Sequence, residues 1–186
     1  MLATSRPVDD SSNPFWTYSL ALYGRPGVVE ACLALQERHG LDVNLLLFAC
    51  WSGSRGHRLT SEELDALIAA TAEWHARVVV PLRGLRRWLK GREAAAQGAA
   101  GALRARIKAQ ELEAERIEQD LLHEAMPLDA GEPSPEAAAA NLLAVCRAAG
   151  IRLDPADCGD LATLLAQALH GLAAADARVL LSREPA

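Results

Sequence analysis

The sequence predicts an all-α protein, a single-domain bundle of about six to eight helices of which one is long and amphipathic. Its 186 residues suffice for one domain with a hydrophobic core. The apolar part of the composition consists mainly of 37 Ala and 30 Leu, against 2 Phe and 2 Tyr. Ala and Leu favour helices, whereas strands are enriched in β-branched and aromatic residues. A β-sandwich or a large parallel sheet is therefore not expected.

The first part of the chain carries start and stop signals of three short helices. Asn13 followed by Pro14 can cap and begin a helix. Gly40 can end a helix in the left-handed conformation, and Asp42 can cap the next one. We expect these helices at residues 14 to 23, 26 to 40 and 43 to 51. The polar residues 1–12 before them are expected to form a disordered leader.

A fourth helix is predicted by the capping box that Thr60 and Glu63 can form. Pro81 lies inside the helical pattern that follows, and its missing N–H predicts a kink or a short break before the segment ends near Lys90. Residues 91–101 are rich in Ala and Gly, so this stretch is a candidate hinge.

Apolar residues at three- and four-residue spacing predict one long amphipathic helix from about 100 to 126. The expected seam contains Leu103, Ile107, Gln110, Ala114, Ile117 and Leu121. Such a seam can pack inside one domain or pair two copies of the chain. A homodimer formed through residues 103–125 is therefore a secondary expectation.

Two C-terminal helices are predicted after a turn rich in Pro and Gly, with Ser134 as the cap of the first and Asp157 or Asp160 at the start of the second. Both are expected to pack back onto the long helix. The expected boundaries are a compact N-terminal part at 13–90, C-terminal helices at about 135–149 and 158–175, an all-helical domain over 13–180, and a frayed tail at 181–186.

Composition and charge exclude several protein classes. The net charge of -5 does not fit a globally basic nucleic-acid binder. No stretch approaches the roughly 18 apolar residues that a membrane span needs, and the N-terminus has no apolar signal segment. The four cysteines are widely spaced and are expected to stay reduced. We therefore expect a cytoplasmic protein without a membrane partner.

No motif of an established chemistry is present. The sequence contains neither a phosphate-binding loop nor a dinucleotide-binding fingerprint, and no nucleophile elbow surrounds Ser54. A di-metal helical bundle would show Glu-x-x-His pairs, and the nearest match is a single Asp120-x-x-His123. We expect no catalytic residue, no cofactor and no metal, so an enzyme is the less favoured class.

Charge is distributed unevenly, with six positive and no negative residues between 77 and 92, followed by an acidic block between 111 and 124. Arginines beside tryptophans can bind an anion, a nucleic acid or a protein partner. Alternatively, the basic and acidic blocks pair with each other. The candidate residues of this basic segment are Arg77, Arg83, Arg86, Arg87, Lys90, Trp74 and Trp88.

Most of the aromatic residues lie in the first 74 positions. They can form the core of the N-terminal helices or line a pocket for a small ligand or a peptide. The candidate pocket residues are Trp16, Tyr23, Asp42, Asn44, Trp51 and His57.

The segments Asn13-Pro14-Phe15-Trp16 and Gly40-Leu41-Asp42-Val43-Asn44-x-Leu46-Leu47-Phe48 give the chain a family resemblance. Over residues 13–90 it resembles a proteobacterial family of small all-helical proteins that is classed as a domain of unknown function. The resemblance implies an all-helical cytosolic protein and brings no established activity, cofactor or catalytic residue.

The leading functional hypothesis is a non-enzymatic interaction or adaptor module with a protein partner. The first alternative is nucleic-acid or ribosome binding through residues 77–92. The second is a small-ligand binder or an enzyme that uses the aromatic N-terminal pocket.

Overall fold

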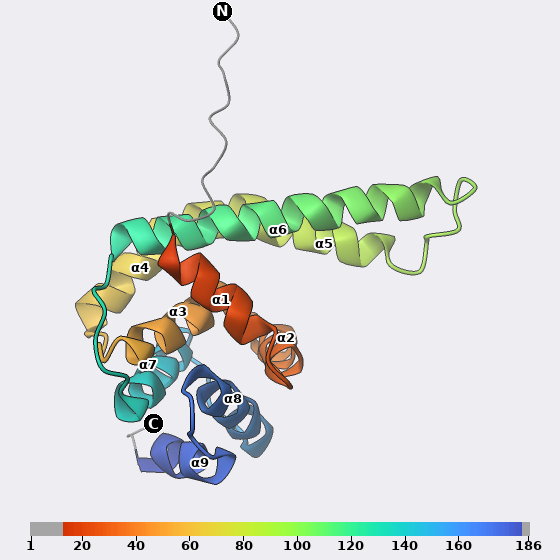
Figure 1. The fold of residues 1–186 in the computed structure, drawn as a ribbon. Helices are drawn as coiled ribbons and strands as arrows, with labels where there is room; N and C mark the ends of the chain where they lie inside the picture. Colours follow the sequence, from red (N-terminus) through yellow and green to blue (C-terminus); the bar gives the residue numbers. More distant parts are fainter. Residues whose placement is uncertain (1–12, 184–186) are drawn as a thin grey trace, which may run out of the picture.

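The computed structural model describes residues 13–183 and confirms an all-α fold (Figure 1). The expected disordered leader at 1–12 and the last residues of the expected tail lie outside the described part. The described chain forms α1 (Pro14–Tyr23), α2 (Val28–His39), α3 (Val43–Ser54), α4 (Ser61–Trp74), the π-helical turn η1 (His75–Val79), α5 (Val80–Leu89), α6 (Ala99–Ala125), α7 (Pro135–Ala148), α8 (Pro155–Ala168) and α9 (Ala174–Arg183).

Local caps explain where most of these helices begin. The side chain of Asn13 accepts hydrogen bonds from the N–H groups of Phe15 and Trp16, and Asp42 accepts one from Asn44. Thr60 and Glu63 form the expected capping box at the start of α4. These side chains satisfy backbone donors that have no partner inside the helix.

The irregularity expected at Pro81 is a π-helical turn that joins α4 to α5 without a break. Pro81 has no N–H to donate to the carbonyl of Arg77. The N–H of Val80 donates to the carbonyl of His75, five residues earlier. Because α4, η1 and α5 follow one another without a break, they count as one continuous helix. The described residues therefore form eight helices. The turn also sets the position from which the His75 side chain reaches α6.

Helices α5 and α6 form a long hairpin whose far end extends beyond the rest of the molecule (Figure 1). The core lies below it, where α3 packs against α7, and α8 packs against α2 and α9. The rings of Phe15, Phe48 and Trp51 contact one another in this core, with centroids 5.0 to 5.3 Å apart.

The buried face of α6 differs from the predicted seam. The buried residues include Glu111, Glu118 and Gln119, whereas Gln110 is exposed. Hydrophobic periodicity cannot identify this face because two of its inward positions carry carboxylates. Leu103 and Ile117 remain partly exposed, at 40% and 38%. Homodimerisation through residues 103–125 stays a prediction.

The C-terminal helices were expected to pack onto the long helix, but α7 and α8 pack mainly against α3, α2 and α9. Their boundaries also differ from the expected ones. A second helix was expected over 158–175, but α8 ends at Ala168 and a turn separates it from α9. Leu181, expected in a frayed tail, lies in α9 and is 7% exposed. The reason is tertiary, since the apolar face of α9 is buried against α7 and α8.

Asp157 attaches α8 to α2 and is fully buried. Its Oδ1 accepts hydrogen bonds from Arg38 and His39, each at 2.9 Å. Burial opposes its ionisation, but the backbone N–H of Asp154 and the side chains of His39 and Arg38 outweigh burial, so the pKa of Asp157 is lowered.

A lowered native pKa means that this stabilisation is present above the pKa of the unfolded chain and is lost as the pH falls. We expect Asp157→Asn to reduce the free energy of unfolding at pH 7 by about 1 kcal/mol or more. The difference from wild type should shrink as the pH falls below about 4. Urea titrations followed by circular dichroism at several pH values measure this, with the exposed Asp176→Asn as control. An equal loss for both variants at pH 7 would contradict the assignment.

Candidate functional site

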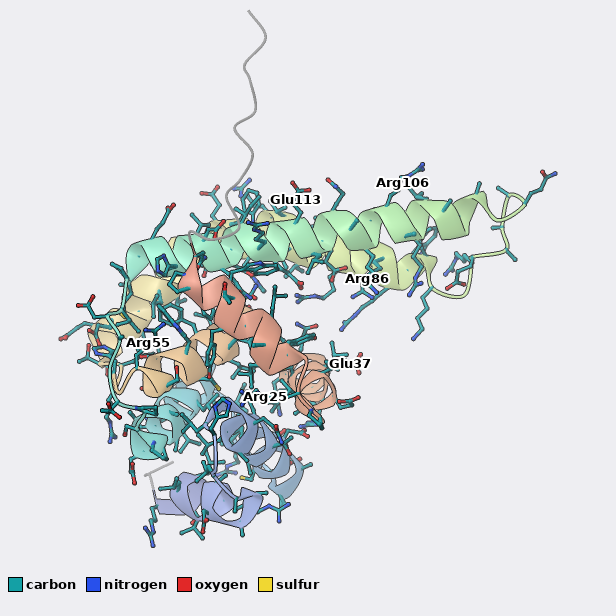
Figure 2. The ribbon with its side chains drawn as sticks, in the orientation of Figure 1. Arg25, Glu37, Arg55, Arg86, Arg106 and Glu113 are labelled. Carbon is teal, nitrogen blue, oxygen red and sulfur yellow. The ribbon has the colours of Figure 1, made fainter. Side chains whose placement is uncertain are left out.

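A groove with a volume of about 500 Å³ lies between the α5–α6 hairpin and the body formed by α1, α2 and the start of α3. We call it the basic groove. Arg86 on α5 and Glu37 on α2 lie on its two sides, whereas Arg106 and Glu113 lie on the outer face of α6 (Figure 2). Its volume falls within the range of about 300 to 1,000 Å³ typical of ligand pockets.

The groove carries an excess of positive charge. Three carboxylates line it, Glu37, Glu111 and Glu115. Six cationic side chains also line it, so that three positive charges remain in excess: Arg83, Arg86, Arg87, Lys90, Arg104 and Lys108.

Two of the arginines pair with the acidic block of α6. Arg83 is 3.4 Å from Glu111 and 2.9 Å from Glu115, and Arg86 donates to Glu111 at 3.1 Å. Arg83 and Glu111 are buried. These ion pairs hold α5 against α6, so part of the basic segment has a structural role.

The cationic side chains nearer the tip of the hairpin form fewer or longer ion pairs. Arg87 lies 3.7 Å from Glu37 across the groove. Within the described residues, Lys90 and Lys108 form no ion pair, and both are exposed. Their ammonium groups are available to an anion at the outer end of the groove.

Large apolar side chains are exposed on the same surface. Leu20, Leu33 and Leu112 line the groove and are 53%, 38% and 54% exposed. The half-buried rings of Trp16 and Tyr23 extend this surface along α1. Exposed apolar residues are ordinary when scattered, but a concave group of them indicates an interaction site.

Three buried polar atoms of the groove residues have no hydrogen-bond partner within the described part of the chain. They are Ser19 Oγ, Gln119 Oε1 and Arg104 Nε. Ser19 and Gln119 are 2% and 3% exposed. Arg104 Nε still lies 3.8 Å from Glu93 Oε1 in an ion pair. Most buried polar atoms in proteins are paired, so the unpaired atoms of Ser19 and Gln119 beside the groove are candidates for contact with a ligand.

The two ends of the groove differ in the side chains that line them. Its outer end lies near the tip of the hairpin, where Lys90, Arg104 and Lys108 are located. Its inner end lies where α1 meets α6, near Trp16 and Gln119. A ligand that fits both ends therefore has anionic and apolar parts.

A buried polar network adjoins the inner end. Asn44 lines the groove and donates to Glu118, while Gln119 donates to Asn44 at 2.8 Å. Glu118 Oε1 lies 2.8 Å from His75 Nδ1, which is 3.4 Å from Asp42 Oδ2. The network thus connects the groove to α3, η1 and α6.

The network shifts the pKa values of two of its titratable groups, Asp42 and His75. Burial, together with the nearby Glu118 carboxylate, raises the pKa of Asp42 to about 6. The hydrogen bond to Glu118 raises the pKa of His75 above its usual value. Two carboxylates close together resist simultaneous ionisation, and the imidazolium form of His75 partly compensates them.

Residues 14–122 match the model of a protein family described as "Protein of unknown function (DUF2390)". The match covers more than half of the chain. The chain belongs to the DUF2390 family. No curated protein and no solved structure matches the chain. The segment shared with DUF2390 contains α1 to α5 and nearly all of α6, and therefore every residue of the basic groove and of the buried network.

Seven of the predicted site residues line the groove that lies in this DUF2390 segment. They come from both predicted sets, which the fold brings together: Arg83, Arg86, Arg87, Lys90, Trp16, Tyr23 and Asn44.

The other residues of the basic segment lie elsewhere. Arg77 is exposed and pairs with Glu73 one turn earlier. The indole of Trp74 donates to the backbone carbonyl of Ala114 at 2.9 Å, which fixes α4 against α6. Trp88 is 59% exposed and lies under Arg92.

Three residues of the predicted pocket do not line the groove. Asp42 caps α3 and belongs to the buried network. Trp51 is fully buried because α3 crosses the centre of the core. His57 lies 3.1 Å from Glu63 at the start of α4. The structure therefore does not bring all six residues together in the groove.

Sequence reasoning missed Ser19, His75, Leu112, Glu118 and Gln119. The available signal was a pair of carboxylates, Glu111 and Glu118, seven residues apart on one face of a predicted helix. The spacing predicts that Glu111 and Glu118 lie on the same face of the helix. It does not predict which other part of the protein that face contacts.

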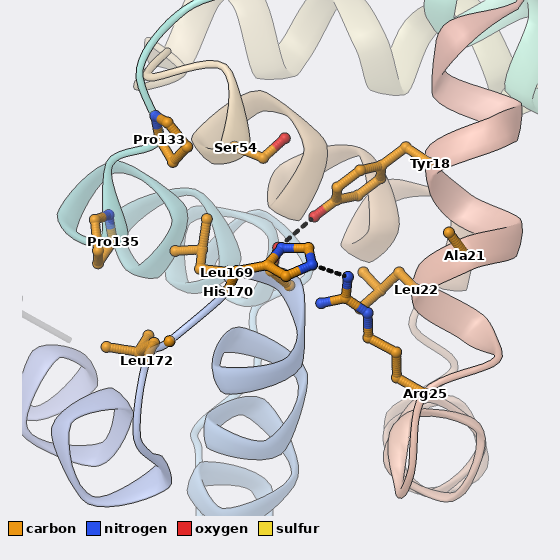
Figure 3. A pocket seen from close by; sticks show the side chains of 12 residues that line it. Tyr18, Ala21, Leu22, Arg25, Ser54, Pro133, Pro135, Leu169, His170 and Leu172 are labelled. Atoms are coloured by element: carbon orange, nitrogen blue, oxygen red, sulfur yellow. Dashed lines mark hydrogen bonds between the residues drawn. The ribbon is translucent and has the colours of Figure 1, made fainter.

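A second cavity of about 590 Å³ lies between α1 and the end of α8 (Figure 3). Tyr18 donates to the carbonyl of Ala168 at 3.2 Å, and Arg25 contacts the carbonyl of Gln167 and the His170 ring. These contacts satisfy carbonyls at the C-terminus of α8, which have no partner inside the helix. The cavity thus has polar groups that already serve to dock α8 on α1.

Within residues 13–183, no helix has both the length and the apolar character needed to cross a lipid bilayer.

Proposed function

We propose that this protein is a non-enzymatic interaction module of the cytoplasm whose basic groove binds an acidic, amphipathic segment of a partner protein. The observation that carries the proposal is the combination, in one groove, of exposed Leu20, Leu33 and Leu112 with an excess of cations. Apolar anchors supply affinity, and complementary charge supplies orientation and fast association.

The dimensions favour a peptide segment. Arg104 and Gln119 line opposite parts of the groove and lie 15 residues apart on α6. At 1.5 Å per residue they are about 22 Å apart, which matches about four turns of a bound helix. An amphipathic helix that lays its apolar face in such a groove is a common mode of recognition.

Charge favours an acidic protein segment over nucleic acid. Glu37, Glu111 and Glu115 also line the groove and would repel closely spaced phosphates. A peptide can keep its carboxylates away from these three glutamates, whereas every nucleotide carries a phosphate. An acidic helix can place carboxylates opposite Lys90 and Lys108 and apolar side chains further in.

The cysteines support the cytoplasmic part of the proposal. All four are free thiols, and Cys32, Cys50 and Cys146 are buried while Cys158 is exposed. Proteins of oxidising compartments commonly pair their cysteines.

Selection from a random peptide display library tests the proposal. The wild-type chain is the bait, and a Lys90→Glu, Lys108→Glu, Leu112→Glu variant is used for counter-selection. We expect the retained peptides to combine Asp or Glu with Leu or Phe at three- and four-residue spacing. Their affinity, measured by fluorescence anisotropy, should fall by roughly tenfold or more in the Lys90→Glu, Lys108→Glu variant and weaken with salt.

A matched control carries the same change of charge away from the groove, Arg77→Glu with Arg106→Glu. Both residues are exposed, and neither lines the groove. This control should bind the selected peptides as wild type does. Equal weakening in both double variants, displacement of the peptides by a single-stranded oligonucleotide, or selection of peptides without acidic residues would contradict the proposal.

A further inference from the structure

Three metal-ligating side chains from three separate elements meet beneath the inner end of the basic groove. They are Asp42 before α3, His75 in η1 and Glu118 on α6. One ligand atom of each lies within 4.8 Å of the others. His75 Nδ1 is 2.8 Å from Glu118 Oε1 and 3.4 Å from Asp42 Oδ2.

These separations suit a shared ion. Zn²⁺ binds imidazole nitrogen and carboxylate oxygen at about 2.0 to 2.2 Å, so its ligand atoms lie about 3.4 Å apart in a tetrahedral site. The separation of His75 Nδ1 from Asp42 Oδ2 equals this value, at 3.4 Å, and its separation from Glu118 Oε1 is shorter, at 2.8 Å. Small rotations of the three side chains would therefore enclose an ion.

The net negative charge of the cluster also favours a bound cation. The side chains of Glu118 and Asp42 are 0% and 11% exposed, and a single imidazole faces both carboxylates. Arg83, whose charge acts on Asp42 and His75, already pairs with Glu111 and Glu115. Even with His75 protonated, one negative charge remains, and buried negative charge is costly without a counter-ion.

One oxygen of each carboxylate accepts a hydrogen bond from Asn44. Its backbone N–H donates to Asp42 Oδ1 at 2.8 Å, and its side-chain amide donates to Glu118 Oε2. Each carboxylate therefore turns its other oxygen toward His75. Hydrogen bonds of this kind orient the ligands in metal sites.

We propose that Asp42 Oδ2, His75 Nδ1 and Glu118 Oε1 bind a divalent transition-metal ion of the Zn²⁺ type. One imidazole and two carboxylates suit such an ion better than Mg²⁺, which prefers oxygen ligands alone. Three protein ligands leave one position of a tetrahedral ion for water. The ion would link α3, η1 and α6 next to the groove.

Isothermal titration of the untagged, metal-free chain with ZnCl₂ tests this site, with MgCl₂ as a parallel titrant. We expect one equivalent of Zn²⁺ to bind and to raise the melting temperature, because a ligand that binds only the native state stabilises it. Asp42→Asn keeps an oxygen that can cap α3 but loses the anionic ligand. It and His75→Gln should each weaken Zn²⁺ binding by about tenfold or more.

Two controls separate this site from incidental binding. His57→Gln alters a more exposed His–carboxylate pair, His57 with Glu63, and Cys158→Ser removes the exposed thiol. Both should bind Zn²⁺ as wild type does. Circular dichroism shows whether Asp42→Asn and His75→Gln remain folded, and Glu118→Gln provides a third ligand variant. The proposal is overturned if Zn²⁺ produces no heat and no thermal shift, or if folded ligand variants bind as tightly as wild type.

Discussion

Replacing Gly53 with valine is expected to prevent stable folding, and Gly53→Ala should already lower the free energy of unfolding by about 3 kcal/mol or more. Gly53 lies in α3 where it crosses α7. A Cβ at this position would lie 2.3 Å from the Cβ and 2.4 Å from the Cα of Ala138. Since one of these atoms is backbone, the clash is relieved only by separating the two helices.

Urea denaturation followed by circular dichroism measures this effect. Gly84→Ala is the matched control, because Gly84 lies in α5 and no atom approaches a Cβ there within 4 Å. That variant should be as stable as wild type or more stable by up to about 1 kcal/mol. If the two alanine variants unfold at the same urea concentration, the close α3–α7 packing is not essential.

The second large effect is expected at Glu111. Glu111→Ala should lower the free energy of unfolding by about 3 to 5 kcal/mol, because it removes one partner of a buried ion-pair network. The side chains of Glu111 and Arg83 are 6% and 10% exposed, and Arg86 also donates to Glu111. Without the carboxylate, two guanidinium groups would remain between α5 and α6 with less compensation.

The same urea titration separates this network from ordinary surface charge. Glu113 has the same charge and lies two residues along α6, but it is exposed. Glu113→Ala should change the free energy of unfolding by less than about 0.5 kcal/mol. If the two variants lose equal stability, the Arg83–Glu111–Arg86 network does not hold the hairpin together.

The helices were predictable because their signals are local. Asn13, Asp42, Thr60 and Ser134 each cap a helix by bonding to a backbone N–H two or three residues away. Such bonds depend on neighbouring residues rather than on the rest of the fold. Pro81 likewise marks an irregularity in the turn just before it, although only the structure shows that this turn is π-helical and brings His75 to Glu118 on α6.

The candidate site was predictable only in part. The basic segment and the aromatic residues were recognised separately, and the groove combines Arg83, Arg86, Arg87 and Lys90 with Trp16 and Tyr23. Trp51 and His57 were assigned to the same pocket because composition shows which residues are aromatic or titratable, not which way they face. Trp51 is in the core.

The sequence by itself determined the all-α class, most helix starts and the positions of the charged blocks, because helix propensity, capping and apolar spacing act over a few residues. Only the tertiary structure decided that Glu111 and Glu118 face inward, that Asp42, His75 and Glu118 meet, and that a groove lies beneath the hairpin. The physical reason is that a carboxylate becomes buried when a distant cation or donor compensates it. Such partners lie far away in the chain, so no local pattern of residues identifies them.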